Sequence, residues 1–334
     1  MTGSLVTAAT PGTPPAAWGD PGRWFVEDEA AIAAIDARGA FDETVFRDGP
    51  QTLGGLAVVR FDRIEVLSRA SRRELGLDGL TGPVTLVGGG QAQWQSAVWT
   101  VPGAPRAEVV RNLVSRAVVH CRQDGSTPVA LFVRPQDEAA FAAGFDGMAV
   151  ARPAEPCALL ELPANTTTDG FIAGLPDRKV RQNWNRDLRD RRDLGLECSV
   201  VDLTPEVARA AAEGVAHVRA GNGTPDHPRI AAWRLTESRR RPGEHRVIRL
   251  SQDGVPVSHI FVTLLGDYMS VHALSLGVHP HRRTLYHQTF LNSVDLACAM
   301  GVRTVVFGQG HLMPKVARGC VLEPRGRFIA EATA

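Results

Sequence analysis

The sequence predicts an α/β protein with two domains, and three observations support this prediction. The chain has 334 residues, about twice the length of a typical domain. Hydrophobic residues make up 44% and charged residues 22%, which is typical of a globular chain and excludes a disordered one. The order strand, proline-containing turn, helix, strand occurs once in each half of the chain. We interpret the halves as two copies of one unit; chance similarity between such units is the alternative.

The first copy lies in the N-terminal half. Trp94–Val101 is a run of apolar and small residues that predicts a strand, and the prolines of Pro102–Pro105 end it. Apolar residues then recur at helical spacing over Ala107–Val119, which predicts a helix. A second strand is predicted over Val129–Val133.

The second copy follows in the C-terminal half. Val257–Leu265 and Tyr268–Gly277 predict two strands, joined by the two-residue hairpin turn Gly266-Asp267. Leu285–Met300 has the apolar spacing of a helix, and Val302–Phe307 predicts the strand after it.

A proline- and alanine-rich segment, Ala151–Pro156, predicts the domain boundary. We therefore expect a first domain over residues 21–156 and a second over 157–334. Residues 1–20 are rich in Pro, Gly, Thr and Ala and lack Lys and Arg, so they predict a flexible tail rather than a secretory signal.

Charge and histidine content differ between the two halves. Residues 1–156 hold 14 Arg and 18 Asp/Glu, a net charge of −4, and the remainder holds 37 − 14 = 23 basic and 36 − 18 = 18 acidic residues, a net charge of +5. Nine of the ten histidines also follow residue 156. We expect the chemistry to lie in the second domain.

The five cysteines indicate a reducing compartment. They are scattered and odd in number, and none forms a C-x-x-C pair, which argues against a disulfide framework and a zinc site. No run approaches the roughly 18 uninterrupted apolar residues of a membrane span. We expect a cytoplasmic protein, and the Arg-rich, Lys-poor composition hints at a bacterial source.

The turn before the predicted helix at Leu285 carries the pattern V-x-P-x-x-R, formed by Val278, Pro280 and Arg283. The N–H groups at a helix N-terminus can bind an anion. This strand, turn and helix resemble those of the GNAT acyltransferases. In that family the turn continues x-x-G-x-G/A and its amides bind the pyrophosphate of acyl-CoA. Here Tyr286 and Gln288 occupy the glycine positions.

A longer order of features resembles the FemAB-like branch of the GNAT superfamily: a basic helix over Lys179–Arg192, Leu-Gly-Leu, a hairpin, a helix, Phe-Gly-x-Gly, Lys315 and Gly319-Cys320. The resemblance implies two tandem GNAT-like domains with mixed, mostly antiparallel sheets flanked by helices. It also implies formation of an amide bond, with aminoacyl-tRNA or acyl-CoA as co-substrate and no permanently bound cofactor. The donor-binding residues that it implies are Arg283, Tyr286, Gly308 and Gly310.

The basic helix has one apolar face, since Val180, Trp184 and Leu188 recur every four residues. We predict phosphate contacts of a tRNA on the other face, from Arg178, Lys179, Arg186 and Arg189. The alternative is a solvated face with Arg–Asp pairs within the helix.

The predicted hairpin places polar residues on one face. With Gly266-Asp267 as the turn, Phe261 would face His272, and alternation puts His259 and His272 on that same face, with Ile260 and Ala273 on the apolar one. Histidine titrates near neutrality, so His272 is a candidate general base for an attacking amine, and His259 is a weaker one. A hydrogen-bonded core histidine is the alternative for each.

Lys315 is one of only two lysines in the chain. It follows Gly308-Gln309-Gly310 at the end of a predicted strand, where ligands bind in open α/β sheets. We predict that it stabilises an oxyanion or holds a phosphate. A surface lysine is the alternative.

These features predict transfer of an acyl or aminoacyl group to a small-molecule or peptide amine. No activated Ser or Cys motif is present, so direct attack is expected. His279, His281 and His287 are close in sequence, but no carboxylate or thiol that could complete a metal site lies near them, so no metal is expected. Three alternatives stay open: an aminoacyl-tRNA donor, an acyl-CoA donor, and a degenerate GNAT fold that only binds a partner. The acceptor and the oligomeric state do not follow from the sequence.

Overall fold

The computed structural model describes residues 41–47, 54–61, 77–88, 98–100, 103–221, 227–239, 244–265 and 267–330. The predicted tail over residues 1–20, the start of the predicted strand at Trp94 and the turn residue Gly266 lie outside these residues. The chain divides into two compact units, Met1–Glu155 together with Pro324–Ala334, and Pro156–Glu323. The segment Pro324–Ala334 belongs to the first unit because its strand, β12, pairs with β5 of that unit. The sequence prediction had placed this segment in the second domain.

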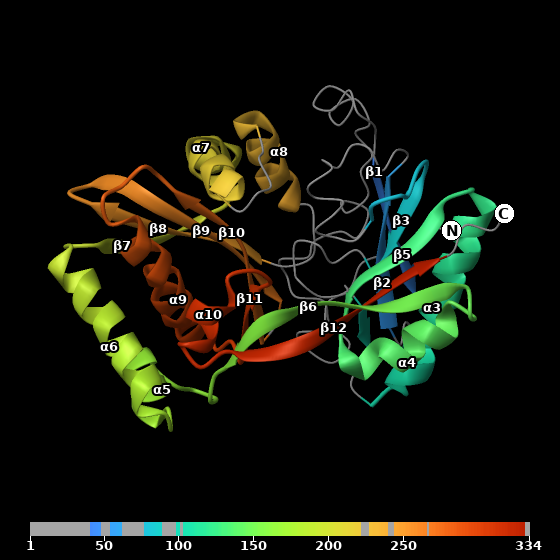
Figure 1. Cartoon of the computed structure of the whole chain (residues 1–334), viewed down its shortest axis with the longest axis horizontal. Helices are drawn as coiled ribbons and strands as arrows, with labels where there is room; N and C mark the ends of the chain where they lie inside the picture. The colour runs from blue at the N-terminus through green and yellow to red at the C-terminus, as the bar shows by residue number, and fades with distance from the viewer. Residues whose placement is uncertain are drawn as a thin grey trace. The chain divides into compact units, whose positions relative to one another are not determined.

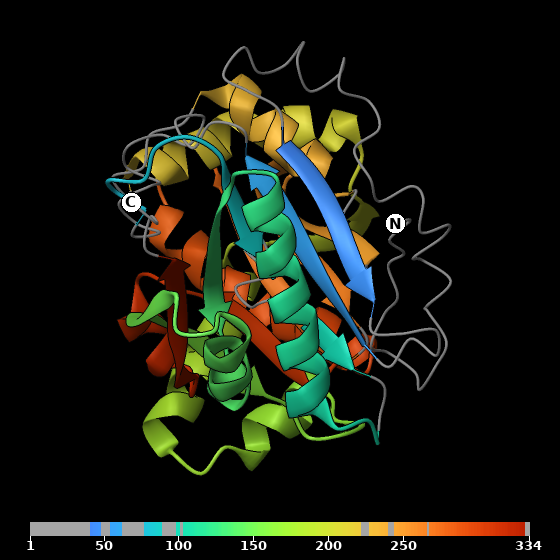
Figure 2. The same ribbon diagram turned by 90° about the vertical axis from the view of Figure 1, so that its right-hand side faces the viewer.

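The first unit contains a mixed sheet in the strand order β1-β2-β3-β5, with the end of β12 beside β5. Helices α3 and α4 cover one face of its strands (Figure 2). Neighbouring strands are antiparallel except β3 and β5, which run parallel. Its elements are β1 Phe41–Arg47, β2 Gly54–Phe61, β3 Val84–Val87, β4 Val98–Thr100, α3 Arg106–Gln123, β5 Thr127–Val133, α4 Pro135–Gly144 and the end of β12 Val321–Ala330.

The second unit has the strand order β6-β11-β10-β9-β8-β7. Helices α7 and α8 lie on one side of β8–β10, and α9 and α6 lie on the other (Figure 1). Only β10 and β11 among these neighbours run parallel. The elements are β6 Ala149–Glu161, α5 Thr168–Gly174, α6 Arg178–Asp193, β7 Glu197–Asp202, α7 Pro205–Gly221, α8 Pro228–Ser238, β8 Glu244–Gln252, β9 Val255–Leu265, β10 Tyr268–Leu276, α9 Arg282–Ala299, β11 Thr304–Gly308 and α10 Leu312–Val316.

Each unit contains one pair of parallel neighbouring strands whose connection includes an 18-residue helix. In the first unit these are β3, β5 and α3, and in the second they are β10, β11 and α9. The predicted α/β class with mixed, mostly antiparallel sheets is confirmed. The strand predicted over Trp94–Val101 is present in its described part, β4, which pairs with β2, and the parallel partner of β5 is β3.

The hairpin of β9 and β10 has the predicted register near its turn and a different one beyond it. A β-bulge at His272 inserts one residue, so Phe261 pairs with Ala273 and not with His272. Ala273 therefore lies with Phe261 against α7 and α8, although alternation predicted it on the opposite face with Ile260.

Local residues determine where helix α6 begins and ends: an aspartate at its start and a glycine after its last turn. The Asp177 carboxylate accepts hydrogen bonds from the N–H groups of Lys179 (2.6 Å) and Val180 (3.3 Å), as an N-cap does. At the other end Gly195 has a φ of 59°, and the next residue, Leu196, donates its N–H back to the Arg191 carbonyl over 3.0 Å. The Leu-Gly-Leu stop is thus a glycine C-cap.

A buried ion pair attaches α6 to the loop after α10. Both nitrogens Nε and Nη2 of Arg318 donate to the Asp187 carboxylate, over 2.7 and 2.9 Å, and the two residues are 1% and 0% exposed. The Trp184 indole donates to the Arg318 carbonyl over 3.1 Å. The Gln288 amide of α9 donates to the Asp187 carbonyl over 2.7 Å. One buried residue of α6 thereby joins three segments.

We expect Asp187→Asn to lower the free energy of unfolding by about 3 kcal/mol or more, because it leaves the Arg318 charge buried without its counterion. The exposed Asp193→Asn should stay within about 0.5 kcal/mol of wild type. Urea unfolding followed by tryptophan fluorescence measures both. Equal midpoints for the two variants would contradict the argument. The double variant Asp187→Leu/Arg318→Met should be more stable than Asp187→Asn, because it removes both charges together.

Candidate functional site

The sheet of the second unit opens between β10 and β11. The two strands pair only from Tyr268 to Ser270 on β10, and both strands carry an irregularity immediately beyond this stretch. On β10 this irregularity is the bulge at His272. His272 is half-buried and its Nε2 atom is shielded from solvent. The candidate base thus lies where two parallel strands separate, a position at which a substrate can reach the backbone of a sheet.

Tyr286 lies at this opening, between the end of β10 and the loop after β11. Its ring packs edge-on against Phe290 (5.5 Å between centroids) and against His311 (6.4 Å). It also packs against a cluster that includes Leu276 of β10. Burial raises the pKa of Tyr286 to about 12, so the phenol is neutral at pH 7. Where the GNAT turn has a glycine, this chain therefore has the Tyr286 ring, which fills the space between the end of β10 and the loop after β11.

The loop after β11 is held by Lys315. Gly308 and Gly310 both have a φ of 68°, and His311 has a φ of 43°, so the loop uses the left-handed region repeatedly. The Lys315 ammonium donates to the carbonyls of Gly308 (3.0 Å) and Gln309 (2.7 Å), and the residue is 5% exposed. Lys315 is not a surface lysine. These two hydrogen bonds orient the loop, and contact with an oxyanion or phosphate stays a prediction.

His259 lies on the other face of the sheet from this loop. It is 9% exposed and shares its strand face with Phe261, which packs against α7 and α8. Lys315 belongs to α10, which packs through Leu312 into the core on the α9 side. Burial and, to a lesser degree, Arg249 lower the pKa of His259. The structure therefore separates this candidate base from the predicted lysine.

The start of α9 offers an anion-binding surface. The N-cap residue His281 makes no side-chain cap, and the described residues provide no hydrogen-bond partner for the N–H groups of Arg283 and Thr284. Arg283 is exposed beside them. Such N–H groups and the helix dipole favour a bound anion.

His287, one turn into α9, connects this surface to α6. Its side chain is 13% exposed, and its Nδ1 lies 4.0 Å from the Asp187 carboxylate. Burial, together with smaller repulsive effects of Arg318, Arg186 and Arg283, lowers the pKa of His287 to about 4. Arg186 and Arg283, which the sequence placed in separate motifs, therefore act on one imidazole. Only the i+4 position of His287 relative to Arg283 could have indicated this.

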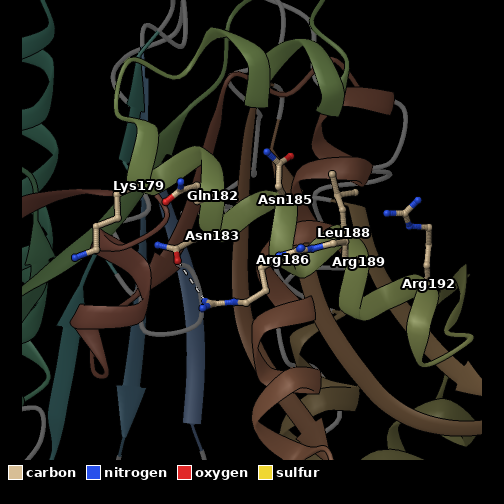
Figure 3. A pocket seen from close by; sticks show the side chains of 8 residues that line it. All are labelled: Lys179, Gln182, Asn183, Asn185, Arg186, Leu188, Arg189 and Arg192. Atoms are coloured by element: carbon tan, nitrogen blue, oxygen red, sulfur yellow. Dashed lines mark hydrogen bonds between the residues drawn. The ribbon is translucent and has the colours of Figure 1, made fainter.

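The exposed face of α6 is polar and cationic (Figure 3). It forms an open groove of about 760 Å³, lined by Lys179, Gln182, Asn183, Asn185, Arg186, Leu188, Arg189 and Arg192. All of these come from one helix, which is convex, so this is a surface rather than an enclosed cavity. We call the exposed Arg178, Lys179, Arg186, Arg189 and Arg192 the α6 cations.

The α6 cations are not consumed by ion pairs. Within the described ranges, none of them has a salt bridge, and Arg186 makes one side-chain hydrogen bond, to Asn183 (3.3 Å). The charged residues that could form pairs within the helix bind outside it instead. The acid Asp187 binds Arg318, and Arg191 binds Asp295 on α9 over 2.5 Å. The intrahelical Arg–Asp pairs of the alternative interpretation are absent from the part of the chain that the structure describes.

The described part of the chain has neither a cluster of metal ligands nor a membrane-spanning helix. No three His, Cys, Asp or Glu side chains there are grouped so that they could hold a metal ion. None of the helices described there has the length and apolar character needed to cross a membrane.

Similar folds occur among solved structures. FemX aligns with 88% of this chain and 88% of its own at 9% identity and a TM-score of 0.57. L-PGS from Bacillus licheniformis covers 92% of this chain and 93% of its own at 9% identity and a TM-score of 0.53. A conserved protein of unknown function from Bacteroides thetaiotaomicron covers 90% of this chain and 89% of its own, at 12% identity and a TM-score of 0.54.

At these identities the likeness concerns the fold alone: the chain has a fold similar to those of FemX and L-PGS, as the resemblance to FemAB-like proteins implied. No protein-family model matches the sequence, and the comparison with curated proteins found no match.

The lowered pKa of His287 predicts a pH-dependent stability. Between pH 6.5 and about 4 the unfolded chain takes up a proton at His287 that the folded chain does not, so this residue's contribution is present above pH 6.5 and is lost on acidification. The free energy of unfolding of wild type minus that of His287→Gln should therefore decrease as the pH is lowered from 6.5 toward 4, by at most about 1.4 kcal/mol per pH unit.

Urea titrations at four pH values between 7.5 and 4.5 measure this difference. Asp187, whose pKa burial raises to about 6 against the opposing effect of Arg318, titrates in both proteins, so its own contribution largely cancels in the difference. A difference that stays constant with pH would show that burial does not suppress protonation of His287.

Proposed function

We propose that this protein transfers an aminoacyl group from aminoacyl-tRNA to an amine, forming an amide bond. The observation that carries this proposal is the continuity of two anion-binding surfaces. The α6 cations run along one helix from Arg178 to Arg192, and two cations from the two surfaces, Arg186 of α6 and Arg283 of α9, both act electrostatically on His287. The fold shared with FemX and L-PGS supports a transferase.

The length of the cationic face favours a polyanion. From Lys179 to Arg192 it extends about 20 Å at a rise of about 1.5 Å per residue. A pyrophosphate needs only one helix N-terminus, whereas a nucleic-acid backbone presents a phosphate every few ångströms over this length. Five exposed cations without internal counterions therefore suit a tRNA better than a coenzyme.

The chemistry requires one bond to form and one to break. The amine nitrogen attacks the ester carbonyl of the aminoacyl-tRNA, and the bond from that carbonyl to the terminal ribose oxygen breaks. The amine loses a proton and the leaving ribose oxygen gains one. We propose His272 as the group that accepts the amine proton, because it lies where β10 and β11 separate. Positioning of the two substrates would supply much of the remaining acceleration.

The alternative is an acyl-CoA N-acyltransferase. The free N–H groups of Arg283 and Thr284 favour it, and the Tyr286 ring at the strand opening opposes it. Calorimetric titration with acetyl-CoA and free CoA distinguishes the donors. Micromolar binding of both would replace the tRNA proposal, whereas absence of heat together with binding of charged tRNA would support it. Binding of neither would favour a partner-binding protein without catalysis.

We expect Arg186→Glu/Arg189→Glu to weaken tRNA binding by at least about tenfold and to lower the slope of log Kd against log salt by about 2. Both side chains are exposed, so the melting temperature should not change. Filter binding over a salt series measures the effect.

The matched control is Arg111→Glu/Arg122→Glu, which makes the same charge change on exposed positions of α3. If both double variants weaken binding equally, only net charge matters, and α6 is not the binding surface.

We expect His272→Ala to lower kcat for transfer by about 10²- to 10⁴-fold, the usual contribution of a general base. Transfer of a labelled aminoacyl group to a panel of amines measures it, with His120→Ala on α3 as the control and circular dichroism as the test of folding. A folded His272→Ala protein with the wild-type kcat would remove His272 from the mechanism.

A further inference from the structure

Three hydrogen bonds in series connect the end of α6 to the start of α9. The Gln252 side chain, at the end of β8, donates from Nε2 to the Leu194 carbonyl over 3.0 Å. Nε2 of His279 lies 3.1 Å from Oε1 of Gln252, and the backbone N–H of His281 donates to Nδ1 of His279 over 3.1 Å. Leu194 is the C-cap residue of α6 and His281 the N-cap residue of α9. We call this series the Gln252–His279 relay.

The relay permits only one protonation state of His279. A carbonyl oxygen can only accept, so the Gln252 amide must point its NH₂ group to Leu194 and its oxygen to His279. That oxygen in turn requires a proton on Nε2 of His279. Nδ1 must then keep its lone pair, because it accepts the His281 N–H. The imidazole is therefore neutral, with its proton on Nε2.

The relay also determines where α9 begins. The carbonyl of His279 accepts the N–H of Arg282 over 3.1 Å, and Pro280 between them has a fixed φ. The bond from His281 to the imidazole closes this turn on its other side. The next N–H groups, those of Arg283 and Thr284, are the ones left open at the helix start. Their direction follows from the turn that His279 holds.

We propose that Gln252 and His279 are positioning residues of the donor site, and that they hold the start of α9 in register with α6 only while His279 is neutral. This proposal rests on the proposed function for the identity of the donor. Neither residue needs to touch the donor. They act through the Arg283 and Thr284 N–H groups, and through the C-terminal end of the helix that carries the α6 cations.

Protonation of His279 would break the relay, because a protonated Nδ1 cannot accept the His281 N–H. The ring of His281 lies 5.7 Å from that of His279.

Three variants separate the parts of the relay. His279→Leu removes both of its bonds, and Gln252→Leu removes the link to α6. His279→Asn keeps a side-chain oxygen that can accept the N–H two residues on, as in an Asx-turn, and it cannot titrate. The probe is unfractionated tRNA, whose Kd is measured by filter binding at pH 7.5. NMR reads the ¹⁵N shifts of the His279 ring. It also reads amide hydrogen exchange at Arg282 and Leu285, whose N–H groups donate to the carbonyls of His279 and His281.

At pH 7.5 we expect His279→Leu and Gln252→Leu to weaken tRNA binding about five- to tenfold, the scale of one or two hydrogen bonds, and His279→Asn to recover most of that loss. The slope of Kd with salt should not change, because no cation is removed. The ring shifts should show the proton on Nε2 at pH 7.5.

Wild-type affinity in His279→Leu, or a ring proton on Nδ1, would overturn the proposal. If wild type itself binds no tRNA, the proposed function fails. Hydrogen exchange then decides the relay separately: faster exchange at Arg282 and Leu285 in His279→Leu than in His279→Asn supports positioning, and equal rates refute it.

Discussion

The buried pair of Asp187 and Arg318 is the interaction on which the second unit depends most. An arginine and an aspartate without solvent contact are tolerated only when each satisfies the other, and here the guanidinium binds the carboxylate with two nitrogens. The guanidinium also lies 4.7 Å over the Phe290 ring of α9. Because Gln288 and Trp184 hydrogen bond to the backbone of the same two residues, α6, α9 and the segment after α10 share one anchor. Misplacing any of the three would leave a charge unpaired in the core.

This anchor explains why α6 can present so many cations. A helix with alternating Arg and Asp would ordinarily neutralise itself through pairs three and four residues apart. In this protein Asp187 is withdrawn into the core and Arg191 is turned toward Asp295, so the remaining arginines keep their charge for the exposed face. The ion pair therefore stabilises the packing and, by removing an acid from the surface, makes the surface more basic. Stability and electrostatic character come from the same residue.

The positions where this chain departs from the GNAT turn pattern serve packing. Gln288 is fully buried and binds α6, and Tyr286 fills the region between β10 and the loop held by Lys315. Glycines there would leave that space open to a ligand chain. Among the described residues, no acceptor bonds the N–H groups of Arg283 and Thr284 at the start of α9, and Arg283 is exposed beside them. Side chains close the interior behind this helix start, and further exposed cations lie on α6.

The sequence by itself determined the local features: the amphipathic α6 with its glycine stop, α9 after its proline turn, the two-residue hairpin, and the strand–helix–strand order of both units. These follow from periodicity and turn residues, which act over a few positions. Only the tertiary structure decided the bulge at His272, the burial of Lys315, the electrostatic effect of both Arg186 and Arg283 on His287, and the partner of Asp187. That partner lies 131 residues away in the chain. Such contacts depend on which elements pack together, and a single sequence carries no periodic signal for pairs so distant.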